Sequence, residues 1–137
     1  MGARGVSGFA NDIAADWSLE FENADLETGL KLITDALNFK LSGQITHEEA
    51  AETVAVAAAE LVAAIDGHPM DKDGLSEDAM EWIARAHPAS DPHLTDLARQ
   101  AVSRVTGPDS YIAGTWLEDF EPRWRAFMAG LAAKLAG

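Results

Sequence analysis

Residues 46–67 decide the fold, and they read THEEAAETVAVAAAELVAAIDG. Thr46 followed three residues later by Glu49 is the pattern of a capping box, in which two side chains satisfy backbone N–H groups at a helix start. Gly67 follows the last apolar residue and suits the left-handed turn that commonly ends a helix. The second half of the stretch is apolar almost all round, and only Glu60 interrupts it. We therefore expect a central helix that contacts several neighbours, with its alanines allowing close approach.

Helical periodicity continues from Asn11 nearly to the end of the chain, and no convincing alternating strand interrupts it. We therefore predict an all-α fold, a single helical domain over residues 1–137 with about six or seven helices around the Ala-rich helix. Residues 1–11 are expected to form a Gly-rich N-terminal loop packed on this bundle. The expected helices span residues 12–21, 25–39, 46–66, 77–86, 92–105 and 110–135, the last of them broken near Pro122.

Caps and apolar stripes set the bounds of these helices. Asn11, Ser76 and Asp91 are the expected N-caps, and Pro92 suits a first helical position. Pro88 ends the helix before it. The side chains expected to face the core are Ile13, Trp17 and Phe21; Leu26, Leu30, Ile33 and Leu37; Trp82 and Ile83; Leu94, Leu97, Ala98, Ala101, Val102 and Val105; and Ile112, Trp116, Phe120, Trp124, Phe127, Leu131 and Leu135.

The formal net charge is -13, and it is unevenly distributed. Residues 1–81 contain 17 acids and 4 bases, whereas residues 82–137 contain 6 of each. Such a field repels nucleic acids and anionic membrane surfaces and favours basic protein partners. An acidic surface also keeps a protein in solution, and this simpler interpretation stays open.

The composition excludes several further classes. The chain has no cysteine, which rules out disulfides, thiolate metal sites, iron–sulfur clusters and cysteine nucleophiles. No apolar run approaches the roughly 20 residues of a membrane helix. The first residues lack the features of a secretory signal, and Val6 stands where a myristoylation signal requires Ser or Thr. We expect a cytoplasmic protein of ordinary globular composition, with 47% hydrophobic and 24% charged residues.

Catalytic and metal-binding motifs are incomplete. His47 begins a His-Glu-Glu run that lacks the second His of a zinc-binding helix, and His68 lies in a turn. His87 and His93 flank one proline-rich turn, and a metal site formed by these two residues is an alternative interpretation. The segment Asp71 to Gly74 matches part of a calcium loop but lacks both end ligands. We therefore expect no metal, no cofactor and no assigned catalytic residue.

One row of carboxylates leaves an alternative. Asp12, Asp16 and Glu20 follow one another at four-residue intervals on the first expected helix. Such a row can support acid–base work or hold a hard cation. It can equally stabilise the helix N-terminus and face solvent, and we favour this second interpretation.

The N-terminal segment is the part that helix periodicity does not explain. Its glycines recur at every third position from Gly2 to Gly8, which lets the backbone approach a helical body closely. Phe9 is expected to anchor the segment, and Asn11 to begin the first helix. The segment is either a structural device or a binding surface. As a binding surface it would comprise Gly5, Phe9, Asn11, Asp12, Asp16 and Trp17.

Residues 2–17, GARGVSGFANDIAADW, resemble the opening of a bacterial family, domain of unknown function 4259. Its members typically begin Met-Gly-Ala-Trp-Gly, followed by Gly-Phe and then Asn-Asp-x-Ala-x-Asp. The Ala-rich helix, Trp116-Leu117 and Trp124 extend the resemblance along the chain, whereas Arg4 stands where the family carries an aromatic residue. The resemblance implies a small bacterial cytosolic domain of about this length and implies no activity.

Two functions from different classes remain. The first is an acidic protein-interaction module, an immunity-type or regulatory binding protein whose acidic surface, from Asp12 to Glu81, occupies a basic site on a partner. The alternative is a small-molecule or metal-dependent enzyme that uses Asp12 and Asp16 with a turn histidine. Neither nucleic acid nor a membrane is an expected partner, and the oligomeric state is left open.

Overall fold

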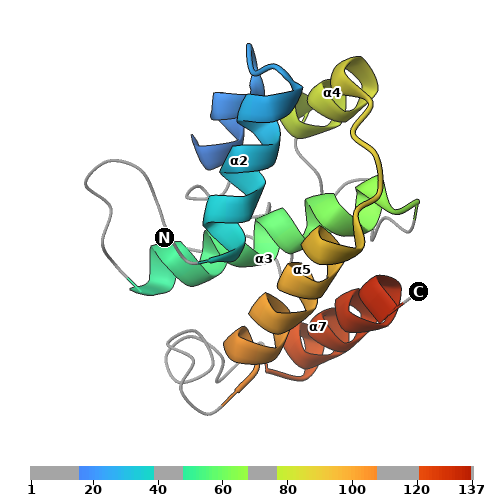
Figure 1. Cartoon of the computed structure of the whole chain (residues 1–137). Coiled ribbons are helices and arrows are strands. Elements are labelled where there is room, and N and C mark those ends of the chain that lie inside the picture. Colours follow the sequence, from blue (N-terminus) through green and yellow to red (C-terminus); the bar gives the residue numbers. More distant parts are fainter. Residues whose placement is uncertain (1–15, 39–47, 68–76, 108–120, 137) are drawn as a thin grey trace.

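Helices make up nearly all of the structure, a computed structural model that describes residues 16–38, 48–67, 77–107 and 121–136 (Figure 1). These ranges contain no strand, so the all-α prediction is confirmed for the part of the chain that they cover. The elements in chain order are the 3-10 helix η2 (Leu19–Phe21) and the α-helices α2 (Leu26–Leu37), α3 (Glu48–Ile65), α4 (Glu77–Ala86), α5 (Pro92–Val105) and α7 (Glu121–Ala136).

The Ala-rich helix α3 lies at the centre, as predicted. It contacts α2, α5 and α7, and α5 and α7 also contact each other (Figure 1). Every residue from Thr53 to Ala63 is buried, because the helix has neighbours on most of its sides. Its alanines shorten the distance at which those neighbours can pack, and one hydrophobic core joins all the described helices.

The predicted ends of α3, α4 and α5 are confirmed where the structure describes them, whereas α2 ends at Leu37, before the expected Phe39, with Asn38 as its C-cap. Gly67 follows α3 with a φ of 85°, in the left-handed region where glycine is least strained. Asp91 caps α5 by accepting a hydrogen bond from the backbone N–H of His93 at 2.9 Å, and Pro92 opens that helix. The bounds of α4 agree with the expected residues 77–86. The expected caps Asn11, Thr46 and Ser76 lie outside the described residues.

The expected stripe of α2 is wrong at its first member. Leu26 is 42% exposed, and the buried face consists of Gly29, Ile33, Ala36 and Leu37. The pattern also missed Gly29, because a glycine carries no apolar side chain and does not register in a hydrophobic pattern. At Gly29 its lack of a side chain is what allows contact, because a Cβ placed there would overlap the indole ring of Trp82.

Three aromatic rings join the N-terminal part of the described chain to α4. Trp17 and Phe21 meet edge to face with ring centroids 5.1 Å apart, and Phe21 and Trp82 are also 5.1 Å apart. All three are buried, which confirms the prediction that Trp17 and Trp82 are core anchors. The side chains of Trp116 and Trp124 lie outside the described residues, as does the Gly-rich N-terminal loop.

The C-terminal helix α7 begins at Glu121, so that Pro122 falls within its first turn, where proline is tolerated. Leu131 and Leu135 are buried as predicted, and Phe127 is half-buried. Met128 is buried as well, although the expected stripe did not include it. The helix expected before Pro122 lies outside the described residues.

Candidate functional site

One end of the molecule carries most of the acidic residues that the structure describes. Residues 16–37 and 77–86, here named the acidic lobe, comprise η2 with the α-helical residues 16–18 before it, α2 and α4, which lie together at one end in Figure 1. The lobe contains nine acidic residues and two basic ones. The acids are exposed except for two half-buried residues, and they are Asp16, Glu20, Glu22, Asp25, Glu27, Asp35, Glu77, Asp78 and Glu81.

Hydrogen bonds from α4 to backbone carbonyls hold the lobe together. The indole Nε1 of Trp82 donates to the carbonyl of Asp25 at 3.2 Å. The guanidinium of Arg85 donates to the carbonyls of Phe21 and Ala24 at 3.1 and 2.8 Å. These acceptors end η2 and precede α2, and the carbonyl of Phe21 also accepts a hydrogen bond from the backbone N–H of Ala24 at 3.2 Å. Arg85 therefore ties α4 to the turn between η2 and α2. The lobe is therefore a fixed arrangement of three elements.

Both basic residues of the lobe are engaged within it. Lys31 pairs with Asp35 at 2.9 Å between Nζ and Oδ2. Arg85 pairs with Glu81 at 3.4 Å between Nη1 and Oε1, in addition to its bonds to backbone carbonyls. Both ion pairs are exposed and of the i,i+4 type, so each contributes only a few tenths of a kcal/mol. They neutralise two of the carboxylates and leave the others to set the surface potential.

Asp25 is the carboxylate with a clear structural role. It is the N-cap of α2, where its Oδ1 accepts a hydrogen bond from the backbone N–H of Thr28 at 2.7 Å. The hydrogen bonds from Thr28, above all that from its backbone N–H, lower the pKa of Asp25 below its ordinary value of 3.8. Its charge therefore stabilises the start of α2 as well as contributing to the negative potential of the surface.

The acidic lobe also carries exposed apolar side chains. Leu19 of η2 is 54% exposed, Leu26 of α2 is 42% exposed and Met80 of α4 is 44% exposed. Among the described residues these are the large hydrophobic side chains that are exposed, and all three belong to the lobe. No position of this kind was expected from the sequence, because Leu26 was assigned to the core and the other two to no face.

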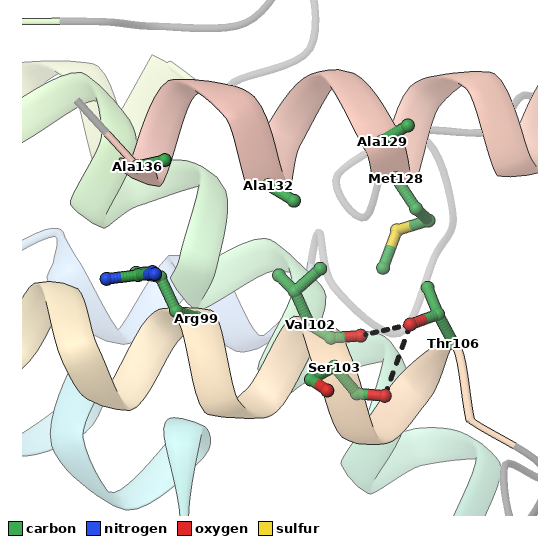
Figure 2. Close-up of a pocket in the computed structure, with 8 residues that line it drawn as sticks. All are labelled: Arg99, Val102, Ser103, Thr106, Met128, Ala129, Ala132 and Ala136. Carbon is green, nitrogen blue, oxygen red and sulfur yellow. Dashed lines mark hydrogen bonds between the residues drawn. The ribbon is translucent and has the colours of Figure 1, made fainter.

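A second candidate region lies along α5 and α7. A groove of about 480 Å³ lies between these helices. Figure 2 shows Arg99 toward one end of it, Thr106 toward the other and Met128 reaching in from α7. Its other lining residues are small or apolar, namely Val102, Ser103, Ala129, Ala132 and Ala136.

A neighbouring groove of about 500 Å³ shares Arg99 and reaches the end of α3. It contains Asp66, whose two carboxylate oxygens accept hydrogen bonds from the hydroxyls of Ser90 and Thr95 at 2.6 and 2.7 Å. Asp96 and Lys134 also line it, so acids and bases face the same space in equal number. This second region therefore has no charge of one sign with which to select a partner.

The residues predicted to form an N-terminal binding surface are only partly described. Asp16 is exposed and Trp17 is buried with 7% of its surface accessible, so the aromatic ring packs in the core. The remaining members of that set, Gly5, Phe9, Asn11 and Asp12, lie outside the described residues.

No cluster of three or more metal-ligating side chains is found within the described ranges. His87 and His93 are both exposed, and Asp16 and Glu20 of the predicted carboxylate row are exposed as well. The other residues of the metal hypotheses, His47, His68 and the segment from Asp71 to Gly74, fall outside those ranges.

Three buried polar residues on α3 were not anticipated. Glu60 is 1% exposed and Glu52 is 6% exposed, and the hydroxyl of Thr53 is buried without a hydrogen-bond partner. A charge count from the sequence treats both glutamates as surface charge, because an acidic residue is seldom buried. Their burial in the central helix leaves the acidic lobe with a larger share of the exposed negative charge.

These features define a class of protein, a small all-α domain with an acidic surface at one end. The residues that the structure describes include no cluster of metal-ligating side chains. The chain belongs to the family whose model is described as a domain of unknown function, DUF4259, and the match covers residues 2–126. This confirms the resemblance seen in the opening sequence. Neither the curated proteins nor the solved structures gave a significant match. None of the helices in the described ranges has the length and apolar character needed to cross a membrane.

Proposed function

We propose that this protein is an interaction module whose acidic lobe binds a basic site on a partner protein. The observation that carries the proposal is the negative charge of the lobe, which contains nine acidic residues and two basic ones. Both basic residues form ion pairs with acids of the lobe itself. Long-range attraction of this kind raises association rates and selects partners of opposite charge. The whole lobe falls within residues 2–126 and so belongs to the part of the chain that matches the family.

An immunity-type or regulatory role fits this surface, because such a protein acts by occupying a site and needs no catalytic group of its own. The partner would present lysines and arginines, as the catalytic clefts of nucleic-acid enzymes commonly do. A cytoplasmic location is part of the proposal, since a chain without cysteine suits a reducing compartment.

The proposal is tested with two variants whose net charge changes equally. In the lobe variant, Glu20→Gln, Glu27→Gln and Glu77→Gln remove three exposed carboxylates. In the control, Gln100→Lys, Ala126→Lys and Ala133→Lys add three charges at exposed positions of α5 and α7. Proteins captured from the source cells by the wild-type chain are purified, and their Kd values for all three chains are measured.

A partner at the lobe should bind the lobe variant about tenfold more weakly, since three exposed ion pairs at roughly 0.5 kcal/mol each amount to that factor. Raised salt should weaken wild-type binding further, because exposed charges are screened. The control variant should lose much less. Equal losses in the two variants, or a partner that is itself acidic, would contradict the proposal, and circular dichroism confirms that each variant is folded.

A further inference from the structure

We propose that the segment bound by the acidic lobe is amphipathic, carrying large apolar side chains as well as lysine or arginine. This inference rests on the proposed function and adds a chemical requirement to it. Leu19, Leu26 and Met80 are the side chains that would meet the apolar face of the segment, and the surrounding carboxylates would meet its basic face.

The first argument is the location of the exposed large hydrophobic side chains. Within the described ranges the large hydrophobic side chains that remain exposed are Leu19, Leu26 and Met80, and each belongs to the acidic lobe. The side chains that the structure describes on α3, α5 and α7, which exclude residues 48–50 and 121–125, include no exposed large hydrophobic one. Exposed apolar side chains are a feature of protein interaction sites, and the described ones all belong to the lobe.

The second argument is that two of these side chains have a carboxylate one helical turn away. Glu77 lies three residues before Met80 on α4, so these two side chains are neighbours on that helix. Glu22 follows η2 and donates its backbone N–H to the carbonyl of Leu19 at 3.1 Å, so the two residues lie one turn apart. Apolar contacts bordered by charge are the usual anatomy of a protein interface, and methionine adapts well to varied partners.

The third argument is that the three elements are held in a fixed relation. η2 and α4 contact each other, and Arg85 of α4 donates hydrogen bonds to Phe21 and Ala24, between Leu19 and Leu26 in the chain. Trp82 donates to the carbonyl of Asp25, the residue before Leu26. The apolar side chains are therefore presented by a preorganised surface, which lowers the cost of binding.

Charge complementarity decides between the possible occupants. A second copy of this lobe would bring together two surfaces that each carry an excess of carboxylates, and like charges in an interface oppose association. Nucleic acid and an anionic membrane are repelled for the same reason. A basic amphipathic segment of a protein satisfies both the carboxylates and the apolar side chains.

The test uses two synthetic peptides of equal length and equal positive charge. One carries leucine and phenylalanine along one helical face with lysine opposite, and the other has glutamine and serine in place of its apolar residues. The chain is used as wild type and as the variant Leu19→Ser, Leu26→Ser, Met80→Ser. All three positions are exposed, so the variant is expected to fold, which circular dichroism checks.

The amphipathic peptide should bind the wild-type chain at least about tenfold more tightly than the polar peptide, and the serine variant should remove that advantage while leaving the polar peptide unaffected. Equal affinity of the two peptides, or an advantage that survives in the serine variant, overturns this inference and leaves the basic-partner proposal intact. Absence of binding by both peptides overturns the inference and also counts against the proposed function.

Discussion

The acidic lobe and the α3–α5–α7 part of the molecule use different side chains for the same task of packing helices together. The lobe relies on three aromatic rings, one glycine and a few hydrogen bonds from side chains to carbonyls. The α3–α5–α7 part relies on many small and aliphatic side chains, each of which contributes little alone. Single substitutions at these residues should therefore destabilise the lobe strongly, whereas single substitutions in the α3–α5–α7 part should each cost less stability.

The same contrast holds at the surface. The lobe exposes carboxylates together with Leu19, Leu26 and Met80, while the grooves along α5 and α7 are lined by alanines and by charges of both signs. In this molecule, the elements that are fixed by specific anchoring residues are therefore also those that carry the acidic and exposed apolar side chains. A surface that must present several side chains in fixed positions benefits from such anchoring.

Replacement of Trp82 should have the largest effect. Trp82→Ala removes a fully buried indole, its ring contact with Phe21 and its hydrogen bond to the carbonyl of Asp25. We expect a loss of about 3–5 kcal/mol in the free energy of unfolding, measured by urea denaturation. Trp82→Phe is the matched control, because it keeps a ring and should cost less. A loss below about 1 kcal/mol for the alanine variant would show that the lobe is not anchored at this residue.

Substitution of Gly29 separates a steric cost from the backbone cost of replacing a glycine. In Gly29→Ala the new methyl group would overlap the Trp82 ring, so the ring must move, at a cost of about 1–3 kcal/mol. Gly67→Ala has open space around its Cβ but a φ of 85°, so it should cost about 1 kcal/mol through backbone strain alone.

Tryptophan fluorescence separates these two glycine variants. The spectrum should change in Gly29→Ala, where a buried indole is displaced, and should match that of the wild type in Gly67→Ala. An unchanged spectrum together with wild-type stability in Gly29→Ala would contradict the described contact between α2 and α4.

Removal of Asp66 tests the other part of the molecule. Asp66→Ala removes the acceptor for the hydroxyls of Ser90 and Thr95, which connect the end of α3 to the start of α5. We expect a loss of about 1 kcal/mol, since each neutral donor contributes modestly and the site is partly exposed. Peptide binding to the lobe should stay at the wild-type level. A loss of affinity as large as that of the Glu20, Glu27 and Glu77 variant would mean that the two regions are coupled.

The smallest expected effect is the pH dependence contributed by Asp25. Because its pKa is lowered in the folded state, Asp25 stabilises the fold fully above its ordinary value of 3.8, and this contribution is lost as the pH falls through the lower folded value. Asp25→Asn keeps a good N-cap and does not titrate. The excess stability of the wild type over this variant should therefore shrink on acidification from about pH 5 to about pH 3. A constant difference across that range would show that the carboxylate charge contributes nothing.

Much of the fold could be predicted because helix ends and apolar periodicity are local properties. The bounds of α4, the cap at Asp91 and the positive φ at Gly67 followed from the residues themselves. The face of α2 could not be predicted in full, because the contact at Gly29 depends on Trp82, more than fifty residues away in the chain.

The negative charge of the candidate site could be predicted from the sequence, whereas the arrangement of its residues in space could not. The acidic excess of the first part of the chain was visible in the sequence. Its gathering on η2, α2 and α4 depends on tertiary contacts, as does the burial of Glu52 and Glu60, which removes two of those charges from the surface. The exposure of Leu19, Leu26 and Met80 had no local signal either, since an apolar residue in a helix is ordinarily assigned to the core.

The most direct test of the lobe as the binding surface is the change in backbone amide chemical shifts when the basic amphipathic peptide is added to the isotope-labelled chain. We expect the shifts to gather in residues 16–37 and 77–86 and to diminish as salt is raised. Shifts that instead follow α5 and α7 along the groove containing Arg99 and Met128 would contradict the account.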